Sequence, residues 1–105
     1  MLIAASASGE KAVPVTIANL AREKGAKIAY LGANPVSPLA KLADISILMP
    51  VPLKGAKRIR AKSGYLNGSL FEQCLLILGD TIALMIANKK KASREFLQRR
   101  HANLE

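Results

Sequence analysis

Two serines and a glycine lie close together near the start of the chain, in a segment whose composition suits anion binding. Ser6, Ser8 and Gly9 follow a short apolar run at residues 2–5, and an amphipathic segment begins directly after them. This order predicts a buried strand, a tight loop and the N-terminus of a helix. Serine hydroxyls and free backbone N–H groups at the positive end of a helix dipole suit a phosphate. The alternative is that Ser6 and Ser8 only cap the helix.

Two further residues carry side chains that transfer protons in enzymes. Glu72 ends the run Ser69-Leu70-Phe71-Glu72, and His101 is the only histidine of the chain. The unperturbed pKa of an imidazole, about 6.5, suits a proton donor or acceptor at neutral pH. The spacing of Ser69 and Glu72 is also that of a capping box, in which Glu72 only accepts a hydrogen bond from the backbone of Ser69. A histidine this close to a chain end has, by default, no role in a site.

Length and composition indicate a single domain with an aliphatic core. The chain has 105 residues, of which 50% are hydrophobic and only 4% aromatic, without tryptophan. Cys74 is the only cysteine and lies within an apolar run. This favours a buried, reduced thiol in a reducing compartment over a disulfide or a metal ligand. The sequence offers no metal site.

The formal net charge of +9 is concentrated in two blocks, residues 54–62 and 89–100. Such a charge suits a nucleic acid, a membrane surface or a small anionic substrate. Aromatic residues that would stack on bases are not interleaved with the basic ones, which argues against nucleic acid. The alternative to any binding role is that both blocks are solvated faces.

No membrane or export segment is expected from the sequence. The most apolar stretch, residues 74–87, runs for 14 residues and contains Asp80. A spanning helix needs about 20 apolar residues. The first residues are too few for a signal-peptide core and lack a basic lead. These observations predict a soluble cytoplasmic protein.

The order of the apolar segments predicts alternating strands and helices. Val13, Ile17, Leu20 and Ala21 recur at helical spacing, and Gly25 is placed to end that helix. A strand at 27–31, a short helix at 38–43 capped by Ser37, and a strand at 45–49 follow. The sequence therefore predicts a βαβαβ unit with a parallel sheet whose strands are buried.

The second half of the chain is organised differently. Residues 53–66 combine five basic residues with two glycines and predict an irregular connection. A long helix is expected at 70–88, apolar around most of its circumference, which indicates a contact with another subunit. A short basic helix is expected at 92–100.

Four segments of the chain resemble the sugar isomerase (SIS) domain family, and within it the 6-phospho-3-hexuloisomerases of the ribulose monophosphate pathway. They are residues 6–10, 34–44, 68–73 and 100–105. The resemblance implies an α/β fold, with a three-layer, flavodoxin-like parallel sheet flanked by helices. It also implies homodimers or homotetramers and an isomerisation that uses no metal or organic cofactor.

The reaction implied by the resemblance interconverts 3-hexulose 6-phosphate and fructose 6-phosphate through an enediolate. Glu72 matches the position of the family's catalytic base. His101 is the candidate for a second proton-handling group, acting in its own subunit or in a neighbouring one. The candidate phosphate-binding residues are Ser6, Ser8, Gly9, Glu10 and Lys11.

The chain departs from the family pattern at two points. Lys11 stands where the family usually has a threonine, so one phosphate-binding hydroxyl is replaced by an ammonium group. The chain also corresponds to the C-terminal three-fifths of a usual member, as one shortened domain with about three parallel strands. The strand at 2–5 would then be an uncovered edge, which predicts association through that edge or through the long helix at 70–88. The alternative is that the functional protein is longer than the given sequence. The alternative function is a sugar-phosphate-binding module without catalysis.

Overall fold

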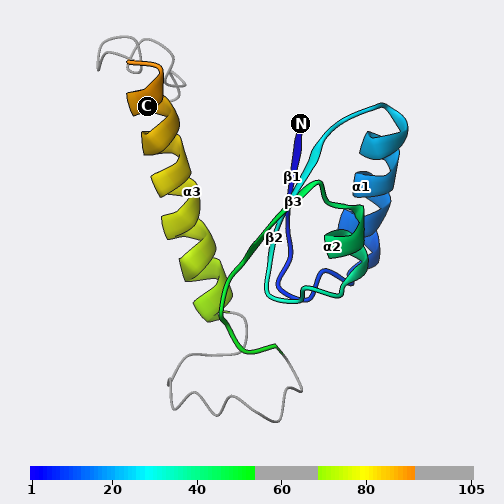
Figure 1. Cartoon of the computed structure of the whole chain (residues 1–105). Coiled ribbons are helices and arrows are strands. Elements are labelled where there is room, and N and C mark those ends of the chain that lie inside the picture. Colours follow the sequence, from blue (N-terminus) through cyan, green and yellow to red (C-terminus); the bar gives the residue numbers. More distant parts are fainter. Residues whose placement is uncertain (54–68, 92–105) are drawn as a thin grey trace, which may run out of the picture. The chain divides into compact units, whose positions relative to one another are not determined.

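The structure, a computed structural model, describes residues 1–53 and 69–91. Its elements, shown in Figure 1, are β1 (Leu2–Ala5), α1 (Ala12–Glu23), β2 (Ile28–Gly32), α2 (Pro38–Leu42), β3 (Ile45–Leu48) and α3 (Ser69–Lys89). The chain divides into two compact units, Met1–Leu75 and Leu76–Glu105. The expected connection at 53–66, apart from Leu53, and the expected helix at 92–100 lie outside the described residues.

The three strands form one parallel sheet in the order β1-β2-β3. Ala4 lies opposite Tyr30, and Tyr30 lies opposite Ser46, so these three residues share one face. The connection from β1 to β2 through α1 and the connection from β2 to β3 through α2 run in the same direction across the sheet. Because such crossovers are right-handed, α1 and α2 lie on the same face of the sheet (Figure 1). The predicted βαβαβ unit is therefore confirmed.

The core lies between the sheet and these two helices. Ala4 of β1, Ala18 of α1, Ile28 and Tyr30 of β2, and Leu39 of α2 form one buried cluster. The core is aliphatic, as the composition predicts, with the exception of Tyr30, which is fully buried. Among the residues that the structure describes, Tyr30 is the largest fully buried side chain, and its ring packs between the sheet and the helices.

The strands are less buried than the sequence predicts. β2 is almost wholly buried, whereas β3 is exposed along its length and β1 is buried only at Ala4. The reason is that β1 and β3 are the two outer strands of the sheet within residues 1–53 and 69–91. In addition, the side chains of Ile3 and Ile45 project from the face opposite α1 and α2 and are 58% and 59% exposed.

Helix α1 forms where it is predicted. The face that packs against the sheet, however, is not the face that carries its larger apolar residues. Ala18 is fully buried and Val15 packs against the core cluster. Val13, Ile17 and Leu20 are exposed by 70%, 49% and 55%. The helix is apolar on two sides, and the sheet covers only one of them.

Helix α3 is longer than the apolar run that predicts it. The helix has 21 residues, with polar residues at both ends. By length and composition alone it is long and apolar enough to cross a membrane. The helix expected at 70–88 is confirmed with one more residue at each end, and it is longer than the apolar stretch at 74–87, which alone was too short for a spanning helix. Leu76, Ile77 and Met85 are among its exposed apolar residues. Cys74 is a free thiol and is half-buried, not fully buried as expected.

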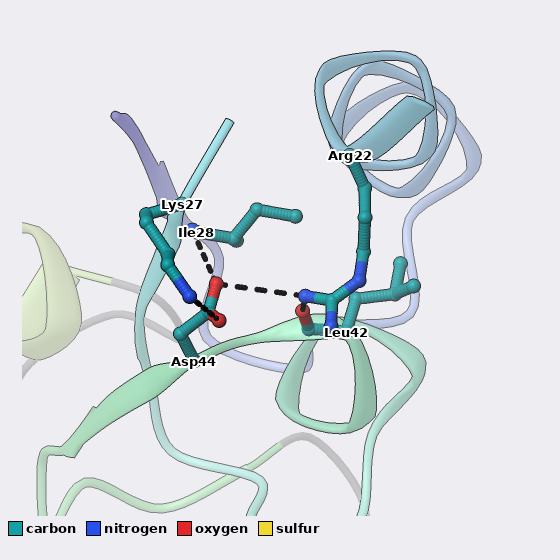
Figure 2. A network of polar contacts seen from close by, with 5 residues as sticks. All are labelled: Arg22, Lys27, Ile28, Leu42 and Asp44. Carbon is teal, nitrogen blue, oxygen red and sulfur yellow. Dashed lines mark hydrogen bonds and ion pairs between the residues drawn. The ribbon is translucent and has the colours of Figure 1, made fainter. Parts of the chain in front are cut away.

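One carboxylate ties together the amino ends of β2 and β3 (Figure 2). Asp44 accepts hydrogen bonds from the backbone N–H of Ile28 at 2.8 Å and from Lys27 Nζ at 3.2 Å. Arg22 Nη1 of α1 lies 3.5 Å from the same carboxylate and also donates to the carbonyl of Leu42 at 2.7 Å. The hydrogen bond from Ile28 and the ammonium of Lys27 hold the pKa of Asp44 below its ordinary value. This carboxylate therefore stabilises the fold in its ionised form.

The variant Asp44→Asn should lower the melting temperature at pH 7, and this loss should shrink as the pH falls from about 4 towards about 2. A carboxyl whose pKa is lowered by folding contributes stability above its unfolded pKa, about 4, and that contribution is lost as the pH falls through the folded value. Thermal unfolding between about pH 2 and pH 7 tests this, with the exposed Glu23→Gln of α1 as the control. An equal loss of stability by Asp44→Asn at both ends of that pH range would contradict it.

Candidate functional site

The loop at residues 6–11 lies at the carboxyl end of β1, next to the segment that follows β2. In parallel α/β sheets, ligands bind outside the carboxyl ends of the strands. The two segments are joined by a backbone hydrogen bond of 2.9 Å from Ala33 N–H to the carbonyl of Ala7. The candidate phosphate-binding residues are therefore at the edge of the sheet where a ligand is expected.

Two carbonyl groups of the loop are held by the segment between β2 and α2. The Ala7 carbonyl accepts from Ala33 N–H and also from the hydroxyl of Tyr30, at 3.4 Å. The Gly9 carbonyl accepts from the backbone N–H of Leu39, in the first turn of α2, at 3.2 Å. These bonds fix the orientation of two successive stretches of the loop backbone.

The orientation of the carbonyls decides where the loop amides point. In a trans peptide the N–H lies opposite the C=O, so the N–H groups of Ser8 and Glu10 face away from the β2–α2 segment. The Glu10 N–H reaches only its neighbour Ser8 Oγ, at 3.4 Å, and the Gly9 N–H lies 3.2 Å from Ser6 Oγ. Both serines therefore cap the loop locally. The 3.4 Å bond is longer than an ordinary N–H···O bond, so an anion can compete for this donor.

The helix that follows presents an uncapped N-terminus. Lys11 is the N-cap residue, with an extended backbone, and its side chain makes no capping hydrogen bond. The first intrahelical bond runs from Val15 N–H to the Lys11 carbonyl at 3.2 Å. The first turn contains no acidic residue. The positive end of the α1 dipole is therefore not neutralised by a side chain of its own first turn.

Glycine is the only residue type that fits at position 9. Its φ is +65°, and a Cβ there would overlap the hydroxyl oxygen of Ser37 and lie 2.7 Å from the hydroxyl oxygen of Tyr30. Ser37 is buried and has a second role, because its Oγ accepts from the backbone N–H of Ala40 and caps α2. The loop can approach the β2–α2 segment this closely only because no side chain intervenes.

Asn34 binds the carboxylate of Glu10, which is the one acidic side chain of the loop at residues 6–11. Its Nδ2 donates to Glu10 Oε1 at 3.1 Å, while its Oδ1 accepts from Val36 N–H at 3.1 Å. The Glu10 carboxylate is thereby tied to the β2–α2 segment. Sequence reasoning did not find Asn34 or Tyr30 as partners of the loop. Asn34 could have been found because it follows the second strand, and the carboxyl ends of parallel strands lie at the same edge of a sheet.

The remaining candidate residues have different positions. Glu72 is an exposed residue in the first turn of α3. In the same turn Ser69 Oγ accepts from the side-chain amide of Gln73 at 3.3 Å. His101 lies outside the described residues. Within residues 1–53 and 69–91, no three His, Cys, Asp or Glu side chains are grouped as metal ligands would be.

Comparison with known proteins relates the chain to one class of enzyme. All 105 residues align at 37% identity with a 3-hexulose-6-phosphate isomerase of Mycobacterium gastri and at 36% with one of Bacillus subtilis (strain 168). The chain is a relative of the 3-hexulose-6-phosphate isomerases. It spans 52% and 57% of those two proteins, or about half the length of the curated relatives it matches. No family model matches it.

A solved structure confirms the fold class. The crystal structure of a protein described as hypothetical superimposes with a TM-score of 0.82 and 28% sequence identity. The match covers 98% of this chain and 55% of that one. The α/β fold with a parallel sheet, and the relation to hexulose phosphate isomerases implied by the sequence motifs, are therefore both confirmed.

Replacing Gly9 by alanine should destabilise the fold by about 2–5 kcal/mol, because a left-handed backbone and an overlap with buried atoms both oppose a Cβ. Gly25→Ala is the matched control, since Gly25 has a φ of +75° but no atom within 4 Å of the added Cβ. That variant should lose only the backbone part, about 1–2 kcal/mol. Chemical denaturation of both variants measures the difference. Equal losses would show that the contact of Gly9 with Ser37 and Tyr30 does not constrain the loop.

Proposed function

We propose that this chain binds the phosphate of a sugar phosphate at the β1–α1 loop and takes part in the interconversion of 3-hexulose 6-phosphate and fructose 6-phosphate. One observation carries the proposal. The amides of Ser8 and Glu10 face outward beside the uncapped N-terminus of α1, in a chain related to isomerases of this substrate.

The phosphate would be held by groups of a single short segment. The outward amides supply hydrogen bonds, the hydroxyls of Ser6 and Ser8 supply two more donors, and Lys11 supplies a positive charge. The helix dipole adds to the attraction of a dianion. The formal net charge of +9 favours the approach of an anionic substrate over a long distance.

The reaction itself moves two protons and leaves the carbon skeleton unchanged. Glu72 would take the proton from C2 of the 3-ketose, and the C–H electron pair becomes the C2–C3 double bond of an enediolate. Return of this proton to C3, with transfer of the hydroxyl proton from O2 to O3, leaves the carbonyl at C2. His101 is the proposed carrier of the oxygen-bound proton, because imidazole can donate and accept near neutral pH. The electrons stay within the substrate.

A second candidate function is sugar-phosphate binding without turnover. The observation that favours it is that the outward amides and the serine hydroxyls lie within the loop, so that binding a phosphate there needs no residue beyond Lys11. The phosphate would still be bound by the same amides and hydroxyls. The proton-transfer groups would then have no role.

The quaternary structure and location belong to the same proposal. We infer that the chain forms a homodimer or homotetramer and is soluble and cytoplasmic, because its substrate is a charged metabolite. In this proposal α3 contacts protein and does not cross a membrane. Glu72 and Asp80 support this, since carboxylates are costly in the hydrocarbon region. Nucleic acid is not a proposed partner.

Replacing Lys11 by glutamine should weaken the binding of fructose 6-phosphate about five- to tenfold, through loss of one charge-assisted contact. The control is Lys24→Gln, which removes the same charge at the opposite end of α1. Isothermal titration calorimetry of both variants measures the effect. If Lys24→Gln weakens binding as much as Lys11→Gln does, the site is not at the loop.

Replacing Glu72 by glutamine should reduce turnover by about 10²–10⁴-fold, the usual contribution of a general base, while fructose 6-phosphate still binds. Glutamine can serve a capping box as glutamate does, so the variant separates the chemical role from the capping role. The matched control is Asp80→Asn, which removes another exposed carboxylate of α3. The assay follows exchange of substrate C–H protons with deuterated water by NMR.

Each outcome of this assay has a definite meaning. Exchange in the wild type that is lost only in Glu72→Gln supports the isomerase. Stabilisation of the wild type by fructose 6-phosphate without any exchange supports the binding module. Full exchange in Glu72→Gln would remove Glu72 from the mechanism. Absence of both stabilisation and exchange would refute the proposed function.

A further inference from the structure

The side chain of Glu10 does not bind where its position in the chain would lead one to expect. Glu10 is the only acidic residue that precedes Glu23, and it directly precedes Lys11, the N-cap residue of α1. A carboxylate this close to a helix N-terminus is attracted by the helix dipole and by the free N–H groups of the first turn. Glu10 Oε1 instead accepts a hydrogen bond from Asn34 Nδ2 at 3.1 Å.

Asn34 is fixed in the orientation that this hydrogen bond requires. Its Oδ1 accepts from the backbone N–H of Val36 at 3.1 Å, so the donor end of the amide is the one that faces Glu10. Its backbone carbonyl accepts from Ser37 Oγ at 3.0 Å. Ser37 is buried and caps α2. The Nδ2 group is therefore held by the turn between β2 and α2.

We propose that Asn34 is a positioning residue, which holds the Glu10 carboxylate away from the N-terminus of α1. The donors of the β1–α1 loop are thereby left to the phosphate of the substrate. This inference rests on the proposed function, because the phosphate site is the same one. Asn34 itself makes no contact with the phosphate in this arrangement and acts only through Glu10.

A released Glu10 carboxylate would compete with the phosphate for the same groups. The N–H groups of the first turn have no carbonyl of their own helix to bond, and Pro14 has no N–H. The donors of Ala12 and Val13 remain, and Glu10 precedes these residues by two and three positions. When a fraction of the molecules has its site closed, the apparent dissociation constant rises by the reciprocal of the open fraction.

The alternative role of Asn34 is only to stabilise the turn. Its bond to Val36 N–H is that of an Asx-turn, which is common between a strand and a helix. The Nδ2 group takes no part in the turn, so the two roles can be separated. In Asn34→Ser the hydroxyl can still accept from the N–H two residues on, but it is too short to hold Glu10. The substitution changes no charge.

Isothermal titration calorimetry with fructose 6-phosphate tests the proposal. Asn34→Ser should raise the dissociation constant about three- to tenfold, since the freed carboxylate then occupies the helix N-terminus in most molecules. Adding Glu10→Gln to this variant should restore the affinity, because a neutral side chain is not drawn to the dipole. The matched control is Asn19→Ser, which removes an exposed side chain that donates only to the Val15 carbonyl within α1, at 3.1 Å. Its dissociation constant should equal that of the wild type.

Hydrogen exchange measured by NMR without ligand gives a readout that does not depend on phosphate binding. The amides of Ala12 and Val13 should exchange more slowly in Asn34→Ser than in the wild type, and at the wild-type rate in the double variant. Unchanged exchange in Asn34→Ser would overturn the proposal.

The two measurements together separate this inference from the proposed function. A loss of affinity that Glu10→Gln does not restore would also overturn the inference, since the loss would then come from the turn itself. Unchanged affinity in Asn34→Ser would do the same. If the wild type does not bind fructose 6-phosphate while exchange changes as expected, the proposed function fails and the placement of Glu10 by Asn34 stands.

Discussion

The carbonyl groups of Ala7 and Gly9 are held by the segment between β2 and α2, and the geometry of the site depends on that constraint. A backbone carbonyl near the core needs a partner, and these two find theirs in Ala33 and Leu39. Fixing the carbonyls also fixes the opposite N–H groups, which then point to solvent. A loop whose carbonyls were free to turn would present no ordered donors to an anion.

Tyr30 connects this constraint to the core. Its ring is fully buried among aliphatic side chains, and its hydroxyl donates to the Ala7 carbonyl at 3.4 Å. Gly9 and Gly32 have no side chains, and a Cβ at either would collide with Tyr30. The apolar part of the ring therefore packs the sheet against its helices while the polar end supports the loop. Packing of the core and orientation of the loop amides are maintained by the same side chain.

The two ends of the sheet use different kinds of interaction. At the amino ends, Asp44 and its cationic partners Arg22 and Lys27 tie strands and helix together through charge. At the carboxyl ends the ties are made between neutral groups, apart from the one between Asn34 and Glu10. Fixed backbone amides can orient an anion through directed hydrogen bonds. The ion pairs of Asp44 and the proposed anion site are thus at opposite ends of the same strands.

Most of the fold could be predicted from the sequence because its signals are local. The apolar runs of β1 and β2, the cap at Ser37 and the stop at Gly25 each act within a few residues. The inward face of α1 could not be predicted, because the helix is apolar on two sides and only the sheet decides between them. The loop residues were found from their types, but their orientation depends on Tyr30 and Asn34, which come close only through parallel pairing of β1 with β2. The helix expected at 70–88 agrees with α3 to within one residue at each end, because its apolar residues form a nearly continuous run in the sequence.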